Sequence, residues 1–365
     1  MTEADHSKQL REQVAEAVES GRPLAIRGSG SKDFLGHRVD GDVLEVGKHR
    51  GVVSYAPTEL VVTVRAGTPV SELEKVLAER GQMLPFDPPS HGDTATIGGV
   101  VACGLSGPRR PFAGSARDYV LGMNVINGRA EMMTFGGQVM KNVAGYDVSR
   151  LLTGSMGTLA VLLDISFKVL PLPEAEATRS FAMPMTDAHA MMKSLAARAI
   201  PVSATAWQDG VLRVRLSGSE AAVAAAGHEL GGDEAANDYW HYLRHQRSDY
   251  FDQQDKPGLW RLSVPAAAPL RDLQGEALLD WNGAQRWLRT DLSAQAVRDH
   301  AAGLGGHATL YQGNANDVDV FQPLPKSLVT WHRRIKGAFD PHNILNPGRM
   351  YRDLEPEPID ADAIT

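Results

Sequence analysis

Glycine is concentrated in one stretch of this chain, which runs from Gly92 to Gly157. Thirteen of the 36 glycines fall within these 66 residues, about twice the share that an even spread would give. Glycine is used where backbone must take up positive φ or approach another group closely. We therefore predict that the backbone of this stretch surrounds a large flat or polyanionic ligand. The alternative interpretation, a segment that simply contains many turns, stays open at this point.

Composition limits the classes of protein to which the chain can belong. The 365 residues leave room for two domains of ordinary size or for one large domain. A net charge of −7 argues against a nucleic-acid partner, which would need a basic face. The single cysteine, Cys103, excludes an intrachain disulfide and an iron–sulfur site held by cysteines of this chain alone.

The sequence also bears on localisation. No apolar run approaches the ~20 residues that a membrane-spanning helix needs. The polar first residues do not have the pattern of a secretory signal. We therefore expect a cytoplasmic protein without direct membrane insertion, which is associated with the inner face of a membrane only through partners.

A short segment of small residues, 27–31, follows a predicted strand at 23–26. Successive backbone N–H groups in such a loop can form a nest that binds anions, although an ordinary turn would have the same sequence. The segment is not a dinucleotide-binding fingerprint, because Asp33 stands where the third glycine of G-x-G-x-x-G is required. The Gly-Lys pair at 47–48 lacks the spacing of a P-loop, so neither phosphate motif is present.

Hydrophobic patterning predicts an α+β organisation for the first 173 residues. Apolar residues recur at helical spacing in 7–20 and in 66–80, and a glycine follows each segment. Short β-type segments stand between and after these helices, without regular alternation. We predict strands at 43–46, 51–55, 60–65 and 158–173, and a hairpin formed by 120–126 and 131–135.

After residue 173 the order of elements becomes that of an antiparallel sheet which carries helices on one face. We predict helices at 187–199, 219–230, 236–251 and 293–304, and strands at 202–208, 211–217, 259–265, 277–281 and 307–312. A basic amphipathic helix and two proline-bounded turns close the pattern. We divide the chain into an N-terminal domain (1–173), a cap domain (174–325), a C-terminal helix and turn (326–352) and an acidic tail (353–365) that we expect to be disordered.

Four motifs carry a resemblance to a known family. They are IGG (97–99), KNVAGYD (141–147), LLTGSMGTL (151–159) and FDPHNILNPGRM (339–350). With them the chain resembles the flavoproteins typified by vanillyl-alcohol oxidase and para-cresol methylhydroxylase, and within that family the FAD-binding E subunits of bacterial glycolate oxidases (glycolate dehydrogenases). The resemblance extends over roughly residues 7–352. It implies an FAD-binding domain of two subdomains, of the para-cresol methylhydroxylase type, followed by the cap.

The resemblance also implies a site for FAD, bound without a covalent link. The loop at 27–31 would hold the pyrophosphate, and 88–104 would run from there toward the isoalloxazine. Segment 154–161 would complete the surface that binds the cofactor, and 346–348 would close the site. A pyrophosphate can be held by backbone N–H groups and one arginine. The residues implied are Arg27, Gly28, Ser29, Gly30, Ser31, Pro88, Ser90, Thr96, Gly98, Gly99, Cys103, Gly104, Gly154, Ser155, Gly157, Thr158, Val161, Asn346 and Gly348.

The catalytic residues remain unassigned. Relatives that oxidise 2-hydroxy acids carry a Gly-Asp-Gly-Asn-x-His run and a Glu-His-Gly tripeptide in the second domain, whose side chains are associated with a divalent metal. This chain supplies only His307, and one histidine does not make a transition-metal site. We therefore predict no metal, and we expect substrate oxidation to occur mainly on a partner.

The function that the resemblance implies is that of an FAD-binding subunit of a complex that oxidises glycolate, a small 2-hydroxy acid, to glyoxylate. The implied partners are a flavoprotein D-type subunit and an iron–sulfur F-type subunit, to which electrons would pass from FAD. The rival hypothesis is a structural subunit of the same complex whose flavin site is degenerate or non-catalytic.

Five further residues stand in two alternative roles. Arg109 and Arg110 could meet an acidic substrate or a partner, or they could simply be exposed. Asp118 could act in catalysis with the arginine before it, or the pair could brace a loop. His91 and Cys103 are the nearby side chains to which a flavin could be covalently attached, and we expect neither to be used.

Overall fold

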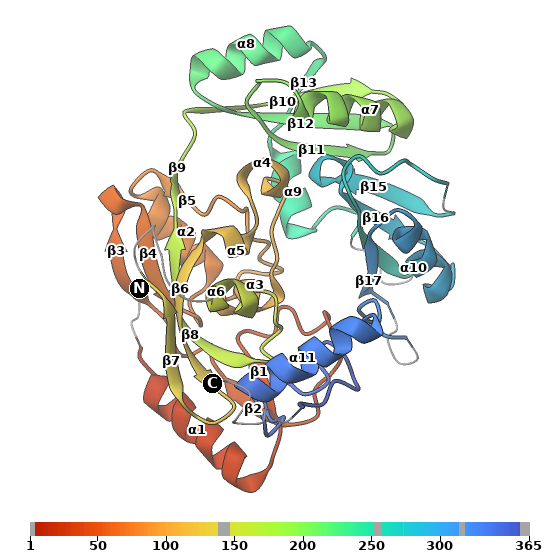
Figure 1. The fold of residues 1–365 in the computed structure, drawn as a ribbon. Coiled ribbons are helices and arrows are strands. Elements are labelled where there is room, and N and C mark those ends of the chain that lie inside the picture. The colour runs from red at the N-terminus through yellow and green to blue at the C-terminus, as the bar shows by residue number, and fades with distance from the viewer. Residues whose placement is uncertain (1–3, 138–146, 252–256, 273, 314–317, 358–365) are drawn as a thin grey trace.

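The computed structural model describes residues 4–137, 147–251, 257–272, 274–313 and 318–357. Most of the motif at 141–147 and the end of the predicted acidic tail lie outside these residues. Figure 1 shows two parts, an N-terminal part and a sheet with its helices above and to the right of it. The blue helix α11 (Lys326–Phe339) returns from the second part to the N-terminal strands.

Two sheets form most of the N-terminal part. β1 (Leu24–Arg27) and β2 (Asp42–Glu45) are a parallel pair. A five-stranded sheet has the order β3-β4-β8-β6-β7, and each neighbouring pair in it is antiparallel. Its strands are β3 (Val52–Ala56), β4 (Val61–Arg65), β6 (Val120–Asn127), β7 (Met132–Gly136) and β8 (Ala160–Lys168), and a short ladder joins β5 (Gln82–Met83) to β9 (Leu170–Pro171).

Local chemistry explains where the N-terminal helices begin and end. α1 (Ser7–Ser20) ends at Gly21, whose φ of 65° suits glycine. α3 (Ile97–Cys103) begins at Thr96, whose side chain accepts a hydrogen bond from the amide of Gly99. The remaining helices of this part are η1 (Pro57–Glu59), α2 (Val70–Ala78), α4 (Arg110–Ala113), α5 (Ala116–Tyr119) and α6 (Val148–Leu152).

An eight-stranded antiparallel sheet forms the second part of the chain. Its order is β13-β10-β12-β11-β15-β16-β14-β17. The strands are β10 (Ala175–Ala182), β11 (Val202–Gln208), β12 (Val211–Gly218), β13 (Asp233–Ala235), β14 (Leu259–Ser263), β15 (Glu276–Asp280), β16 (Gln285–Arg289) and β17 (His307–Gln312), with η2 (Trp281–Gly283) between β15 and β16. All the strands of this sheet follow residue 173, and we keep the division at that residue as our proposal for the domain boundary.

Helices cover the two faces of this sheet differently. α7 (Met185–Ala196) and α8 (Glu220–Leu230) pack on one end of the outer face, and α10 (Ala294–Gly303) packs on the other end. α9 (Asp238–His245) packs on the inner face, which is turned toward the N-terminal part (Figure 1). In the described part of the chain, no helix has both the length and the apolar character to cross a membrane.

One apolar cluster joins the inner face of the eight-stranded sheet to the N-terminal part. Leu105 and Met156 contribute to it from the N-terminal part, and Leu259, Trp287 and Tyr311 contribute from the sheet. All five side chains are buried. The second part of the chain therefore packs directly over the region that contains the glycine-rich segment.

The predicted α+β class is confirmed, and most predicted elements occur at their expected places. The single strand predicted at 158–173 is wrong, because it divides into β8 and β9. The predicted helix at 236–251 is too long, because α9 ends before Gln246, which adopts a φ of 53°. The sequence pattern missed α3 to α6, whose lengths of four to seven residues are too short to show a helical period.

Candidate cofactor site

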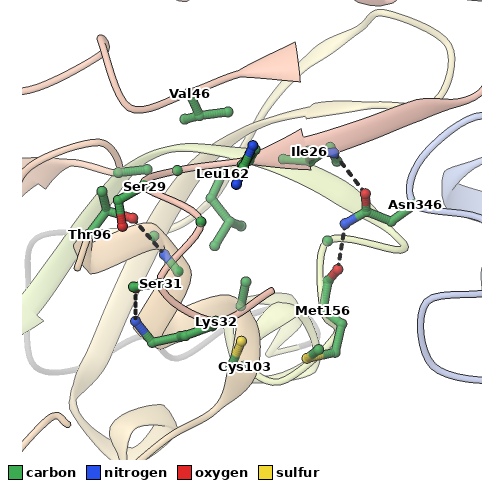
Figure 2. Close-up of a pocket in the computed structure, with 18 of the residues that line it drawn as sticks. Ile26, Ser29, Ser31, Lys32, Val46, Thr96, Cys103, Met156, Leu162 and Asn346 are labelled. Atoms are coloured by element: carbon green, nitrogen blue, oxygen red, sulfur yellow. Dashed lines mark hydrogen bonds between the residues drawn. The ribbon is translucent and has the colours of Figure 1, made fainter. Parts of the chain in front are cut away.

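A cleft opens beside β1 in the N-terminal part of the chain (Figure 2). Four segments that are distant in sequence line it: the loop after β1, the start of α3, the turn before β8 and the segment after α11. About 700 Å³ within it is free of protein atoms, part of it open to solvent.

Glycines allow backbone to form the wall of the cleft. A Cβ atom at Gly98 would lie 2.7 Å from Cβ of Ala66 and 2.9 Å from its carbonyl oxygen. The same carbonyl accepts a hydrogen bond from the Gly98 amide at 2.7 Å. A Cβ atom at Gly28 would collide with Oγ1 of Thr96. Larger residues at either position would therefore push α3 away from β4 or from the loop after β1.

Asn346 joins two walls of the cleft. Its Oδ1 accepts a hydrogen bond from the amide of Ile26 at 2.7 Å, and its Nδ2 donates to the carbonyl of Met156 at 2.7 Å (Figure 2). Its side chain is buried, and its backbone has a φ of 42°, which asparagine tolerates better than most residues. One side chain therefore fixes the edge of β1 against the turn before β8.

Lys32 brings a buried positive charge to the cleft. Its side chain is 7% exposed, and Nζ donates to Oγ of Ser31 at 3.2 Å. Among the described residues it forms no ion pair, and burial lowers its pKa. A buried cation is stable when an anion compensates it. The arrangement is therefore suited to an anionic ligand.

Two arginines hold the loop that carries Lys32. Arg27 pairs with Asp33 across 2.6 Å, and both side chains are about half exposed. Arg349 donates to the carbonyls of His37 at 2.9 Å and of Lys32 at 3.1 Å. The loop is thereby tied to the segment after α11.

The structure brings together more than half of the residues that the sequence singled out. Those that line the cleft are Arg27, Gly28, Ser29, Gly30, Ser31, Thr96, Gly98, Gly99, Cys103, Gly157 and Asn346. They come from all four of the segments that surround it. Their assignment to a cofactor remains a prediction, which the cleft makes geometrically reasonable.

The other predicted residues lie elsewhere. Gly154, Ser155, Thr158 and Gly348 line a neighbouring pocket between α6 and α11, which shares Asn346 with the cleft. Val161 is fully buried in β8, and Gly104 closes the C-terminus of α3. Pro88 and Ser90 contact α9 of the second part instead, since Arg244 donates to the Pro88 carbonyl and His245 contacts Ser90 Oγ at 2.8 Å.

Sequence reasoning missed several residues of the cleft. Lys32 and Arg349 directly follow the predicted cofactor segments 27–31 and 346–348, so extending each segment by one residue would have included them. Ala66 and Leu162 give no chemical signal in the sequence, because they contribute small or apolar surface, and Met156 lies within the predicted segment 154–161 but was not singled out for the same reason. Only the fold reveals such residues.

The structure also shows the surroundings of the residues to which the sequence gives alternative roles. Asp118 accepts hydrogen bonds from the amide and hydroxyl of Ser115 in a capping box, which supports the loop-bracing role. His91 contacts the hydroxyl of Tyr311 at 3.2 Å, and Cys103 lines the cleft. His307 lies exposed at the start of β17. In the described part of the chain, no three His, Cys, Asp or Glu side chains gather closely enough to hold a metal ion.

The residues present fit the FAD that the resemblance implies. FAD offers a doubly charged pyrophosphate and a flat ring system. The cleft offers backbone N–H groups of the loop at 28–31, the uncompensated charge of Lys32, and walls in which glycine is required. Both the charge and the shape of the cleft are thus complementary to a dinucleotide of this kind.

Two family profiles match the chain. The FAD binding domain matches residues 2–136, and the C-terminal domain of FAD linked oxidases matches residues 324–350. The first match includes the loop after β1 and α3, and the second includes α11 and Asn346. The two matches thus include three of the four segments that line the cleft, and the turn before β8 lies outside them.

Two curated relatives extend the comparison. The chain is 46% identical to the glycolate oxidase subunit GlcE of Escherichia coli over 355 residues, which are 97% of this chain and 100% of that protein. It is 32% identical to the glycolate oxidase subunit GlcD of Bacillus subtilis over 185 residues, which are 50% of this chain and 39% of that protein. The similarity to the second protein is therefore partial.

Solved structures support the fold alone. An alkyldihydroxyacetonephosphate synthase superimposes with a TM-score of 0.67, at 17% sequence identity, over 94% of this chain and 74% of that one. Together with the family profiles, this confirms the predicted FAD-binding fold with a following sheet domain.

Proposed function

The chain belongs to the GlcE family of glycolate oxidase subunits, and from that premise we propose that it is the FAD-binding subunit of a complex that oxidises glycolate to glyoxylate. Its reaction class is the FAD-linked oxidation of 2-hydroxy acids. The observation that carries the proposal is the cleft beside β1, where required glycines and the unpaired charge of Lys32 face the same space.

The residues of the cleft would divide the binding of FAD between them. Backbone amides of residues 28–31 would hold the pyrophosphate, and Lys32 would compensate its charge. Gly98 and Gly99 would leave room for the ligand to contact backbone. Asn346 would keep the two walls at a fixed separation through its hydrogen bonds to Ile26 and Met156.

The chemistry itself would come from the cofactor. When bound, FAD supplies a hydride acceptor that can release electrons one at a time. The side chains of Val46, Met156 and Leu162 add apolar surface to the cleft and would exclude water from the ring system. The part of the chain after residue 173 packs over this region and would shield it further.

We further infer a division of labour within the complex. A D-type flavoprotein partner would carry out most of the substrate oxidation, and an iron–sulfur F-type subunit would receive the electrons. The sequence supports this view, because it has neither the Gly-Asp-Gly-Asn-x-His run nor the Glu-His-Gly tripeptide of the relatives that oxidise hydroxy acids. Association with the inner face of a membrane would depend on these partners.

The visible spectrum of the purified chain tests the cofactor proposal. We expect a flavin spectrum that persists through gel filtration after FAD is added. A colourless protein that binds no added FAD would contradict the proposal and would favour the structural subunit. The division of labour is tested by reconstitution, in which the FAD-loaded chain alone should oxidise glycolate far more slowly than the complex. Equal rates would show that this chain is itself the oxidising subunit.

A further inference from the structure

A buried ion pair lies at the end of α11, where that helix returns to the N-terminal part (Figure 1). Lys336 and Asp340 are four residues apart, so their side chains reach the same side of the helix. Nζ of Lys336 and Oδ2 of Asp340 are 2.6 Å apart, and the two side chains are 4% and 0% exposed. The pair is therefore almost completely shielded from solvent.

Lys336 uses all three of its N–H donors within the protein. Besides the bond to Asp340, Nζ donates to the carbonyl of Thr158 at 2.7 Å and to that of Leu345 at 3.0 Å. An ammonium group has three protons, so each proton has an acceptor here. Burial lowers the pKa of Lys336, and the carboxylate of Asp340 opposes that effect. The lysine thus joins α11 to the turn before β8 and to the segment after α11.

Asp340 binds the backbone of the segment after α11. Its Oδ1 accepts from the amide of Ile344 at 3.1 Å, and its Oδ2 accepts from the amide of Leu345 at 2.8 Å. Leu345 is therefore held at its N–H by Asp340 and at its carbonyl by Lys336. The residue that follows is Asn346, whose side chain joins the two walls of the cleft. The pair thus fixes the backbone directly before Asn346.

The bonds of the pair run beside those of Asn346. Lys336 ties the segment after α11 to the turn before β8 at the carbonyl of Thr158. Asn346 ties the same segment to the carbonyl of Met156, two residues earlier in that turn. The segment also pairs with β1, through backbone bonds of 2.7 and 3.0 Å to Leu24. The distance between β1 and the turn is therefore set by the position of this one segment.

The end of α11 is itself fixed on the turn between β6 and β7. The amide of Gly128 donates to the carbonyl of Phe339 at 2.8 Å, and the Arg129 side chain donates to the carbonyl of Ala338 at 2.7 Å. A Cβ atom at Gly128 would lie 2.6 Å from Cα of Asp340 and would collide with its Oδ1. Glycine is therefore required at this position for Asp340 to occupy its place.

The pair is not needed to end the helix. Pro341 follows Asp340, and a proline disfavours helical backbone at the residue before it. The Asp340 amide closes the last turn with a bond of 2.7 Å to the Lys336 carbonyl. A buried ion pair is also a weak source of stability, because the attraction of the two charges is offset by the water that both of them lose. The contacts of the pair indicate a requirement for position instead.

We propose that Lys336 and Asp340 are positioning residues of the cofactor site, which hold Asn346 at the place from which it joins β1 to the turn before β8. Neither is among the described residues that line the cleft, so they would act on the cofactor through Asn346 and the turn. The binding of FAD in the cleft rests on the proposed function. The positioning of Asn346 rests on the bonds of the pair alone.

A double variant separates position from stability. Lys336→Met/Asp340→Asn removes both charges at nearly constant volume, whereas each single variant leaves one buried charge without its partner. We expect the double variant to have a midpoint of urea unfolding closer to that of the wild type than either single variant has. We expect it nevertheless to bind FAD at least about 10-fold more weakly, because the bonds to Thr158 and Leu345 are lost.

Hydrogen exchange in the FAD-free chain tests the positioning of Asn346 directly. The Ile26 amide donates to the Asn346 side chain, so its exchange rate reports whether that side chain is in place. We expect this rate to rise at least about 10-fold in the double variant. The Leu310 amide, which donates to the Val320 carbonyl at 2.9 Å in the second part of the chain, should exchange as in the wild type.

Two further variants complete the test. Gly128→Ala displaces Asp340 from outside the cleft and should also speed the exchange of the Ile26 amide and weaken FAD binding. The result therefore does not depend on whether the double variant folds. Lys326→Met removes an exposed charge from the first turn of α11 and should change neither measurement. Circular dichroism establishes that each variant is folded.

The outcomes distinguish this proposal from the proposed function. If the wild type and the folded double variant bind FAD equally well, the role at the cofactor site is refuted and the cofactor proposal stands. If the Ile26 and Leu310 amides exchange faster to the same extent, the pair stabilises the chain as a whole and the proposal is overturned. Faster exchange of the Ile26 amide alone, in a chain whose wild type takes up no FAD, would support the positioning of Asn346 and refute the cofactor proposal.

Discussion

Asn346 and Ile26 lie 320 residues apart in sequence and are joined by a hydrogen bond of 2.7 Å from the Ile26 amide to the Asn346 side chain. The same side chain donates to Met156 on the opposite wall of the cleft. A single amide group thus holds together an early strand and a turn from the middle of the chain. Removal of the Asn346 side chain would therefore break one hydrogen bond to each wall of the cleft.

We expect Asn346→Ala to lower the free energy of unfolding by roughly 1–3 kcal/mol, because a half-buried amide and a buried carbonyl lose their partners. FAD affinity should fall as well. Asn346→Asp is the informative comparison, since aspartate can accept from Ile26 but cannot donate to Met156. Urea unfolding and FAD titration measure both effects, and wild-type values for the alanine variant would contradict the role assigned to this residue.

Gly98→Ala should destabilise the chain by roughly 1–3 kcal/mol and reduce FAD binding, because the new methyl group overlaps Ala66. The matched control is Gly218→Ala at the end of β12, where a Cβ atom would meet Pro201 at an ordinary 3.5 Å. That variant should keep wild-type stability and flavin content. Thermal unfolding of the two variants side by side provides the measurement, and equal melting temperatures would refute the requirement for glycine at position 98.

Asp87→Asn should cost roughly 3–5 kcal/mol of stability, because Arg215 and Arg109 would be left buried beside a neutral group. Asparagine also tolerates the φ of 46° found here, so the substitution isolates the charge. Asp33→Asn, in the half-exposed pair with Arg27, should cost less than about 1 kcal/mol. Similar losses in the two variants would argue against a special role for the buried network.

The carboxyl group of Asp87 should also make the stability of the protein depend on pH. Burial alone would raise the pKa of Asp87, but Arg215 and Arg109 outweigh it and hold that pKa below its ordinary value. The stability that Asp87 contributes is therefore complete above its unfolded-state pKa of about 4, and it is lost as the pH falls through the lower folded-state pKa. Unfolding curves between pH 7 and pH 3 should show a steeper loss for the wild type than for Asp87→Asn.

Lys32→Met should separate stability from cofactor binding. Burial disfavours the charged form of Lys32 in the free chain, so a methionine of similar length should leave the FAD-free protein as stable as the wild type or more stable. FAD should bind at least about 10-fold more weakly, because the compensating charge is missing. Lys193→Met on the exposed side of α7 is the control. A parallel loss of stability and affinity would indicate a structural lysine instead.

Much of the fold could be predicted from the sequence, because the strands and the long helices have clear hydrophobic periodicity. Val14 and Leu77 stand in such patterns, and both are fully buried on their helices. The short helix α3 has no such pattern, since Ile97–Cys103 is apolar and glycine-rich on every side. Its position is set by Thr96 at its start and by close contact with Ala66, which no window of sequence records.

The site was predictable to the extent that glycine marks close backbone approach. Gly98 lies in the glycine-rich stretch and Gly28 in the predicted anion-binding loop, and both lie where a side chain would collide. Arg109 and Arg110 are identical in type and adjacent in sequence, yet among the described residues only Arg109 is paired with carboxylates. That difference depends on Asp87 and Glu176, which reach this place only through the fold.

The pairing of β1 has a consequence for biosynthesis. β2 covers one edge of this strand, and the backbone of Leu24 bonds on its other edge to Ile344 and Asn346. A growing chain therefore makes β1 early, yet it must synthesise the whole eight-stranded sheet before the second neighbour emerges. Until then one edge of β1 stays open to pairing with other chains. We therefore expect the cofactor to bind at a late stage of folding, and the nascent protein to be prone to aggregation while its second sheet is being made.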